Sequence, residues 1–100
     1  MPMYVVTYVH PDEARWLELL EDHLYWIEAR LEGGTLVASG PLEDVAEKSA
    51  ILVLKADSRA HVDEIVAGDP YVAEGLVTSM TVVAWSPIFG ALAEHANEPR

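Results

Sequence analysis

The order of strand and helix patterns limits the fold of this 100-residue chain more than any other feature. Stretches rich in Val, Ile, Tyr and Thr favour strands, and apolar residues at three- and four-residue intervals favour helices. The predicted strands cover residues 3–9, 35–39, 50–56 and 76–85, and the predicted helices cover residues 10–31 and 58–67. The order β-α-β-β-α-β is typical of an α+β ferredoxin-like sandwich with an antiparallel sheet and both helices on one face.

The first helix is predicted to begin at His10-Pro11-Asp12-Glu13 and to stop at Gly33-Gly34. Proline suits a first helical position, and carboxylates in the first turn complement the positive end of the helix dipole. At helical spacing its apolar stripe is predicted to consist of Leu17, Leu20, Leu24, Ile27 and Leu31. His23 falls on the margin of that stripe.

The second helix is predicted to start after a cap at Asp57 or Ser58 and to end at Gly68 as a left-handed residue. Asp69-Pro70-Tyr71 then forms a turn. Residues 1–100 are predicted to form a single domain, in which residues 88–100 are a C-terminal tail with a short helix around Leu92.

The predicted strands carry apolar residues at both alternating positions, so both faces of the sheet need cover. Two helices can cover only one face of a four-stranded sheet. A second copy of the chain could cover the other, and we therefore expect a homodimer that packs through its sheets.

Composition excludes several classes of protein. Hydrophobic residues make up 51% of the chain, which is typical of a folded domain, and no apolar run approaches the roughly 18 residues of a membrane helix. Seventeen acidic and six basic residues give a net charge of −11, which disfavours nucleic acid as a partner. No cysteine is present, and no secretion signal is recognisable, so a cytoplasmic location is expected.

His23 and Asp69 are the candidates for acid/base chemistry. Imidazole titrates near neutral pH, and a carboxylate on one ring nitrogen would leave the other free as a base. Both residues also have structural interpretations: His23 could donate to a backbone carbonyl, and Asp69 could bond amides of its own turn. Sequence spacing alone does not decide whether the two side chains meet.

Taken together, several segments resemble the YCII-related (YciI-like) family. The matching segments are HLYW at residues 23–26, GTLVASGPL at 34–42, ILVL at 51–54, DPYVAEGL at 69–76 and the strand that ends at Trp85. The resemblance implies a ferredoxin-like fold that dimerises through its sheet into an α/β barrel. It also implies a pocket with His23 and Asp69 as a catalytic pair, lined by Ser39, Gly40 and Pro41.

Other side chains are weaker candidates for the same pocket. Ser39 lacks the Gly-x-Ser-x-Gly context of a nucleophile and is interpreted as a hydrogen-bonding residue. Tyr71 and Trp85 could stack on a flat substrate, or could serve the core or a dimer interface. Arg30 could hold a substrate anion or be solvated. The histidines show no metal-ligand spacing, so neither a metal nor a cofactor is expected.

Two classes of function remain after this reasoning. In the first, the His23–Asp69 pair catalyses an isomerase, lyase or dehydrohalogenase-like step on a small cyclic or carbonyl-bearing metabolite, without a cofactor. In the second, the chain is a non-catalytic dimeric module that binds a small ligand in the same pocket, or an accessory protein. A ferredoxin-like fold does not choose between them.

Overall fold

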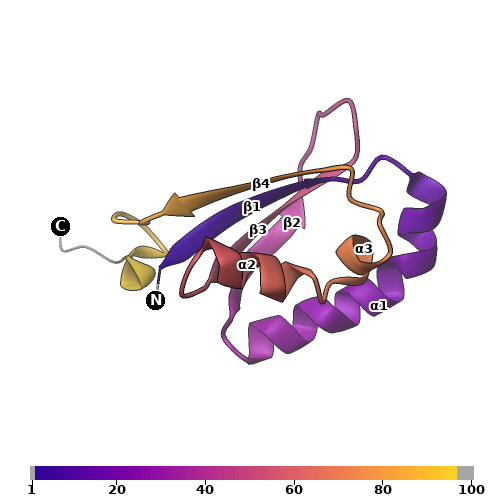
Figure 1. Cartoon of the computed structure of the whole chain (residues 1–100). Coiled ribbons are helices and arrows are strands. Elements are labelled where there is room, and N and C mark those ends of the chain that lie inside the picture. The colour runs from indigo at the N-terminus through magenta and orange to yellow at the C-terminus, as the bar shows by residue number, and fades with distance from the viewer. Residues whose placement is uncertain (1, 97–100) are drawn as a thin grey trace.

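In a computed structural model, which describes residues 2–96, a four-stranded antiparallel sheet lies over three helices (Figure 1). The strand order is β2-β3-β1-β4. The strands are β1 (Met3–Val9), β2 (Leu36–Pro41), β3 (Ser49–Lys55) and β4 (Ser79–Trp85). The helices are α1 (Glu13–Glu32), α2 (Arg59–Val66) and α3 (Pro70–Ala73), followed by a 3₁₀ turn, η1 (Ala93–His95). The predicted ferredoxin-like α+β architecture is confirmed, with all three helices on the same face of the sheet.

The core lies between the helices and alternate residues of the strands. Tyr4, Val6 and Tyr8 of the central strand β1 face the helices, and β1 pairs with both β3 and β4. Their neighbours across the ladders on this face include Leu52, Leu54 and Val82, all buried. Burying one such aliphatic side chain stabilises the fold by about 1.5–3 kcal/mol.

Helix α1 begins three residues later than the sequence predicts. Asp12 is its cap, and the Asp12 carboxylate accepts a hydrogen bond from the backbone N–H of Arg15 at 3.1 Å. Pro11 therefore lies before the helix rather than in its first turn. Capping by a short carboxylate satisfies an N–H that the helix itself cannot, which explains why Asp12 sets the start.

The apolar face of α1 also differs from the predicted leucine stripe. Leu17 is 65% exposed and Leu24 48% exposed, whereas Trp26 is only 7% exposed. The helix is turned so that Trp26 joins the core cluster, because a tryptophan covers more apolar area than a leucine. His23 consequently lies on the inner side of the helix rather than at the margin of its buried face.

The connection after α2 departs from prediction at Gly68. Ser58 caps α2, as one of the two predicted caps. Gly68 does not adopt the predicted left-handed conformation, which the structure places at Gly34, Gly75 and Gly90. A Cβ at Gly68 would lie 3.1 Å from Nε1 of Trp26, so glycine is needed there for close approach to the tryptophan ring.

The last predicted elements are shorter in the structure. Strand β4 begins at Ser79, because the amides of Leu76 and Val77 instead donate to the carbonyl of Tyr71. The predicted tail helix around Leu92 is replaced by η1, and residues 97–100 of the predicted tail lie outside the described residues. No helix within residues 2–96 is long and apolar enough to span a membrane.

Candidate active site

A cavity of about 290 Å³ opens between α1 and the neighbouring strands β2 and β3. Its walls are mostly apolar, with a few polar side chains. The polar and aromatic side chains that line it are His10, Trp16, His23, Ser39, Lys48, Ser49 and Tyr71. A cavity of about 150 Å³ can hold benzene, so this one accommodates a single ring with several substituents.

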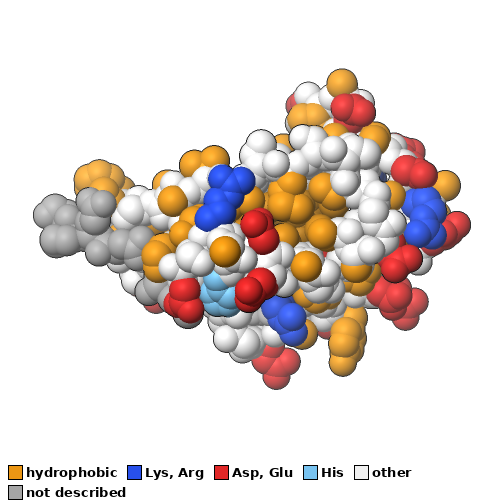
Figure 2. Space-filling view, in the orientation of Figure 1, with side chains coloured by type: hydrophobic (Ala, Val, Ile, Leu, Met, Phe, Trp, Pro, Cys, Tyr) orange, Lys and Arg blue, Asp and Glu red, His pale blue; other side chains and the backbone are white. Residues whose placement is uncertain are grey.

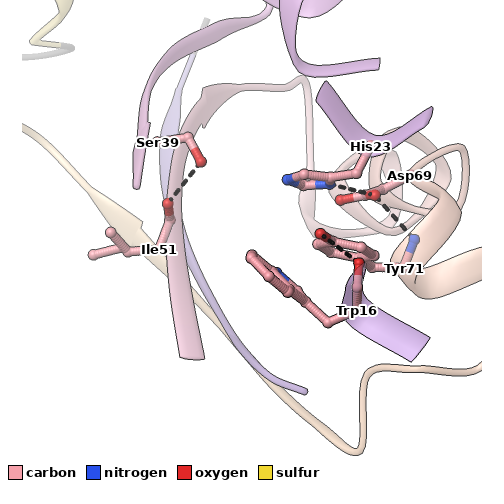
Figure 3. A network of polar contacts seen from close by, with 6 residues as sticks. All are labelled: Trp16, His23, Ser39, Ile51, Asp69 and Tyr71. Carbon is pink, nitrogen blue, oxygen red and sulfur yellow. Dashed lines mark hydrogen bonds and ion pairs between the residues drawn. The ribbon is translucent and has the colours of Figure 1, made fainter. Parts of the chain in front are cut away.

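His23 and Asp69, 46 residues apart in sequence, meet beside this cavity. His23 Nδ1 lies 2.8 Å from Asp69 Oδ1, with 13% of the His23 side chain and none of the Asp69 side chain exposed. In Figure 3 the second ring nitrogen of His23 points away from Asp69. Because a carboxylate only accepts hydrogen bonds, Nδ1 is the nitrogen that donates, which leaves the lone pair of Nε2 available as a base.

Local sequence explains why Asp69 is held so firmly. The residue before a proline is restricted to extended backbone, and Asp69 has φ −72° and ψ 125°. Asp69 caps α3: its Oδ1 accepts the backbone N–H of Tyr71 at 3.0 Å as well as the hydrogen bond from His23. The predicted turn is thus the start of a short helix, with a carboxylate fixed between an amide and an imidazole.

Tyr71 supports the imidazole from below. The rings of His23 and Tyr71 are stacked, with centroids 4.0 Å apart and planes inclined by 10° (Figure 3). The Tyr71 hydroxyl donates to the carbonyl of Trp16 at 3.4 Å. Burial, and secondly the charge of Asp69, raise the pKa of Tyr71 to about 12, so its phenol stays neutral at physiological pH. Tyr71 therefore acts as a rigid support for His23.

Tyr8 lies on the far side of the carboxylate. Its hydroxyl and Asp69 Oδ2 are both buried, and neither has a partner within strict hydrogen-bond geometry. The two groups nevertheless interact: burial first, then the charge of Asp69 and hydrogen bonding with its side chain, raise the pKa of Tyr8 above its usual value. The raised pKa keeps the Tyr8 phenol neutral at physiological pH, so that it can donate toward the carboxylate.

His10 is a cavity residue that the sequence analysis did not single out. It is 2% exposed, and its ring lies 5.2 Å from that of Tyr71. Burial lowers its pKa most, and the charges of Lys48 and His23 lower it further, against the opposing effects of an interaction with the backbone of His10 itself and of the charge of Asp69. The alternation of Tyr4, Val6 and Tyr8 on the helix side of β1 was the signal that could have placed His10 there.

The other predicted site residues divide into two groups. Ser39, Gly40, Pro41 and Tyr71 line the cavity with His23. The hydroxyl of Ser39 donates to the carbonyl of Ile51 at 3.0 Å (Figure 3). Trp85 is not brought to the cavity: it pairs with Met3 at the end of β4, on the sheet face away from the helices.

The basic residue at the cavity is Lys48 rather than Arg30. The guanidinium of Arg30 lies over the ring of Trp26, 5.7 Å from its centroid, whereas the ammonium of Lys48 lies 4.1 Å from the centroid of Trp16, a cavity residue. Among residues 2–96, no cluster of three or more histidine or acidic side chains could hold a metal ion.

Comparison with protein families gives one match: residues 1–86 match the model of the YCII-related domain. No curated protein matches the chain.

Several solved structures share the fold. The dehydrochlorinase TftG of Burkholderia phenoliruptrix, which acts on 5-chloro-2-hydroxyhydroquinone and was solved with 2,5-dihydroxybenzoquinone, is similar with a TM-score of 0.72 and 17% identity. The likeness covers 84% of this chain and 93% of TftG. The protein Atu4242 of Agrobacterium tumefaciens has a TM-score of 0.54 and 19% identity over 87% of this chain and 93% of its own. An antibiotic biosynthesis monooxygenase has a TM-score of 0.54 and 13% identity, over 84% and 96% of the two chains.

Proposed function

This chain belongs to the YCII-related family, and from that premise we propose that it is a small enzyme that uses His23 and Asp69 for general acid/base chemistry. Its substrate is a small cyclic or carbonyl-bearing metabolite. The observation that carries the proposal is the 2.8 Å contact between a buried carboxylate and an imidazole at the wall of a ring-sized cavity. A base positioned in this way contributes about 10²–10⁴-fold to a reaction rate.

The chemistry follows from the two nitrogens of His23. Nε2 takes a proton from a carbon next to a carbonyl, and the electron pair moves onto the carbonyl oxygen to give an enolate. The enolate either regains the proton at another carbon, which is an isomerisation, or expels a leaving group with its electron pair, which is a lyase or dehydrohalogenase step. Asp69 stabilises the imidazolium between these steps through its contact with Nδ1.

Two features of the surroundings support this reaction class. Apolar and aromatic side chains, among them Trp16 and Tyr71, line the cavity, which suits a planar ring. TftG, which shares the fold, is a dehydrochlorinase and was solved with a ring quinone. Of the three proposed step types, dehydrohalogenation of a ring compound is therefore the first to test.

The test is a ligand screen followed by a turnover assay. Hydroxylated and halogenated ring compounds are screened by thermal shift, and the compounds that bind are assayed for product formation. We expect His23→Asn to lower turnover by at least about 100-fold while binding persists. His61→Asn is the matched control, because His61 does not line this cavity. Binding without turnover in the wild type would instead indicate a non-catalytic ligand-binding module.

The proposal includes a homodimer formed through the open face of the sheet. On that face Val83 is 59% exposed and Trp85 is 42% exposed. By strand alternation Thr7 and Thr81 share the face with them. A flat surface with exposed apolar side chains suits a self-complementary two-fold interface. We expect a dimer by light scattering, and a monomer for the double variant Val83→Lys, Trp85→Lys.

A further inference from the structure

His10 is a buried polar residue that the proposed acid/base step does not use. It lines the cavity, and among residues 2–96 neither of its ring nitrogens has a partner within hydrogen-bond geometry, although its own backbone lies near enough to favour the protonated ring. A neutral imidazole always presents one donor and one acceptor. Leaving a buried polar group unpaired costs free energy, so His10 is a group that a ligand oxygen would satisfy.

Lys48 is coupled to His10 at the same wall. The backbone N–H of His10 donates to the carbonyl of Lys48 at 2.8 Å, which ties the end of β1 to the segment before β3. The ammonium of Lys48 lies over Trp16, whose ring also lines the cavity. His10 and Lys48 are therefore joined through their backbones, both line the cavity that His23 lines, and the charge of Lys48 acts on the His10 ring.

The charge of the cavity is unlike that of the rest of the molecule. The chain has 17 acidic residues, yet none of the described carboxylates lines this cavity. Figure 2 shows acidic side chains scattered over the visible face of the molecule, both near its middle and along its edges. Asp69 lies behind His23, but its carboxylate is fully buried and is bonded to His23 and to the backbone N–H of Tyr71. A cationic cavity in an acidic protein selects for a ligand with negative charge.

We infer that His10 and Lys48 form an oxyanion-binding subsite, and that the ligand of this cavity is a planar ring compound that carries an ionised oxygen. The inference rests on the proposed function in one respect only, namely that this cavity is the site where the ligand binds. The subsite holds the oxygen while His23 faces the carbon framework. The shared chemistry is a negatively charged oxygen, supplied either by the ring itself, as in a phenolate or enolate, or by a carboxylate attached to it.

Binding of matched probe pairs tests this inference without any turnover assay. 4-Nitrophenolate is compared with the neutral 4-nitroanisole, and benzoate with the neutral benzamide, by calorimetry at a pH where both acids are ionised. We expect one anion to bind at least about tenfold more tightly than its neutral analogue, because hydrogen bonds to charged groups are the stronger ones. The pair that shows the preference identifies the source of the oxygen.

Variants assign the preference to the two residues. Lys48→Met and His10→Phe should each reduce it to less than about threefold, whereas Lys55→Met, a lysine of a different cavity, should keep it. Lys48 is only partly buried, so its variant decides the question if His10→Phe does not fold.

The inference is overturned if neither anion binds better than its neutral analogue, or if the preference survives Lys48→Met. The outcome is separable from that of the proposed function. An anion preference without turnover in any assay would leave the subsite standing and remove the enzyme. Turnover that depends on His23, with no anion preference, would support the enzyme and rule out the subsite.

Discussion

The described part of the chain, residues 2–96, contains two histidine–aspartate pairs with opposite arrangements. His23 Nδ1 lies 2.8 Å from the buried Asp69, whereas His61 Nδ1 lies 3.7 Å from the carboxylate of Asp57, which is 73% exposed. Each histidine lines a cavity, of about 290 Å³ for His23 and about 340 Å³ for His61. Residue types and cavity size therefore do not distinguish the two places.

The hydrogen bonds of the rings do distinguish them. His61 Nδ1 accepts the backbone N–H of Asp57 at 2.9 Å, so its lone pair is already used and the neutral ring carries its proton on Nε2. His23 Nδ1 faces a carboxylate and carries the proton itself, which frees Nε2 as a base. The comparison teaches that a histidine is prepared for catalysis by the partner of its other nitrogen.

The largest effect is expected for removing the charge of Asp69, with Asp57 as the comparison. Asp69→Asn keeps an oxygen for the N–H groups of Tyr71 and His23, but it removes the charge that stabilises protonated His23. We expect kcat/KM for a substrate found by the screen to fall by about 10²–10⁴-fold. Asp57→Asn should leave it within about twofold. Equal losses in the two variants would show that the buried pair has no special role.

Sequence patterns could predict the elements of the fold but not the difference between these two histidine–aspartate pairs. The β-α-β-β-α-β order was predictable because each element has its own local periodicity. The family resemblance pointed to His23 and Asp69, but spacing could not bring together residues 46 positions apart. The predicted stripe was wrong at Leu17, Leu24 and Leu31, which are exposed, because periodicity records apolar spacing and not which side chain fills the space against the sheet. Trp26 fills that space here.

His10 shows the other limit of the sequence. Its position on the helix side of β1 could be read from alternation, but its lack of a partner depends on side chains from distant segments. Lys48 carries no sequence signal of its own, and the backbone hydrogen bond from His10 ties it to the end of β1 at the cavity. Polar residues gain their roles from tertiary neighbours, which a single sequence does not contain.

The next effect in size concerns stability. Asp69→Ala removes a helix cap and leaves the buried groups around it unpaired, so we expect the free energy of unfolding to fall by about 2–4 kcal/mol. Asp57→Ala changes an exposed carboxylate, and its effect should stay within about 0.5 kcal/mol. Urea denaturation of both variants measures the difference. A change below about 1 kcal/mol for Asp69→Ala would mean that the surrounding groups find other partners or water.

The smallest effect concerns His10, which lines the same cavity as His23, and its contribution to the pH dependence of the free energy of unfolding. Burial lowers the pKa of His10 in the folded chain below its ordinary value of 6.5, so the unfolded chain takes up the proton first as the pH falls. His10 therefore does not reduce the free energy of unfolding above about pH 6.5. Below that pH it lowers this free energy, with a slope of at most about 1.4 kcal/mol per pH unit from this one group.

His10→Phe keeps an aromatic ring against Tyr71 but cannot bind a proton, so urea denaturation at pH 7.5 and pH 5.5 should show a smaller loss of stability in this variant than in the wild type. His61→Phe is the control. Its ring is one-third exposed, and its replacement should leave the wild-type pH dependence in place. If His10→Phe loses as much stability on acidification as the wild type, the acid sensitivity belongs to other groups, and His10 takes up a proton as easily folded as unfolded.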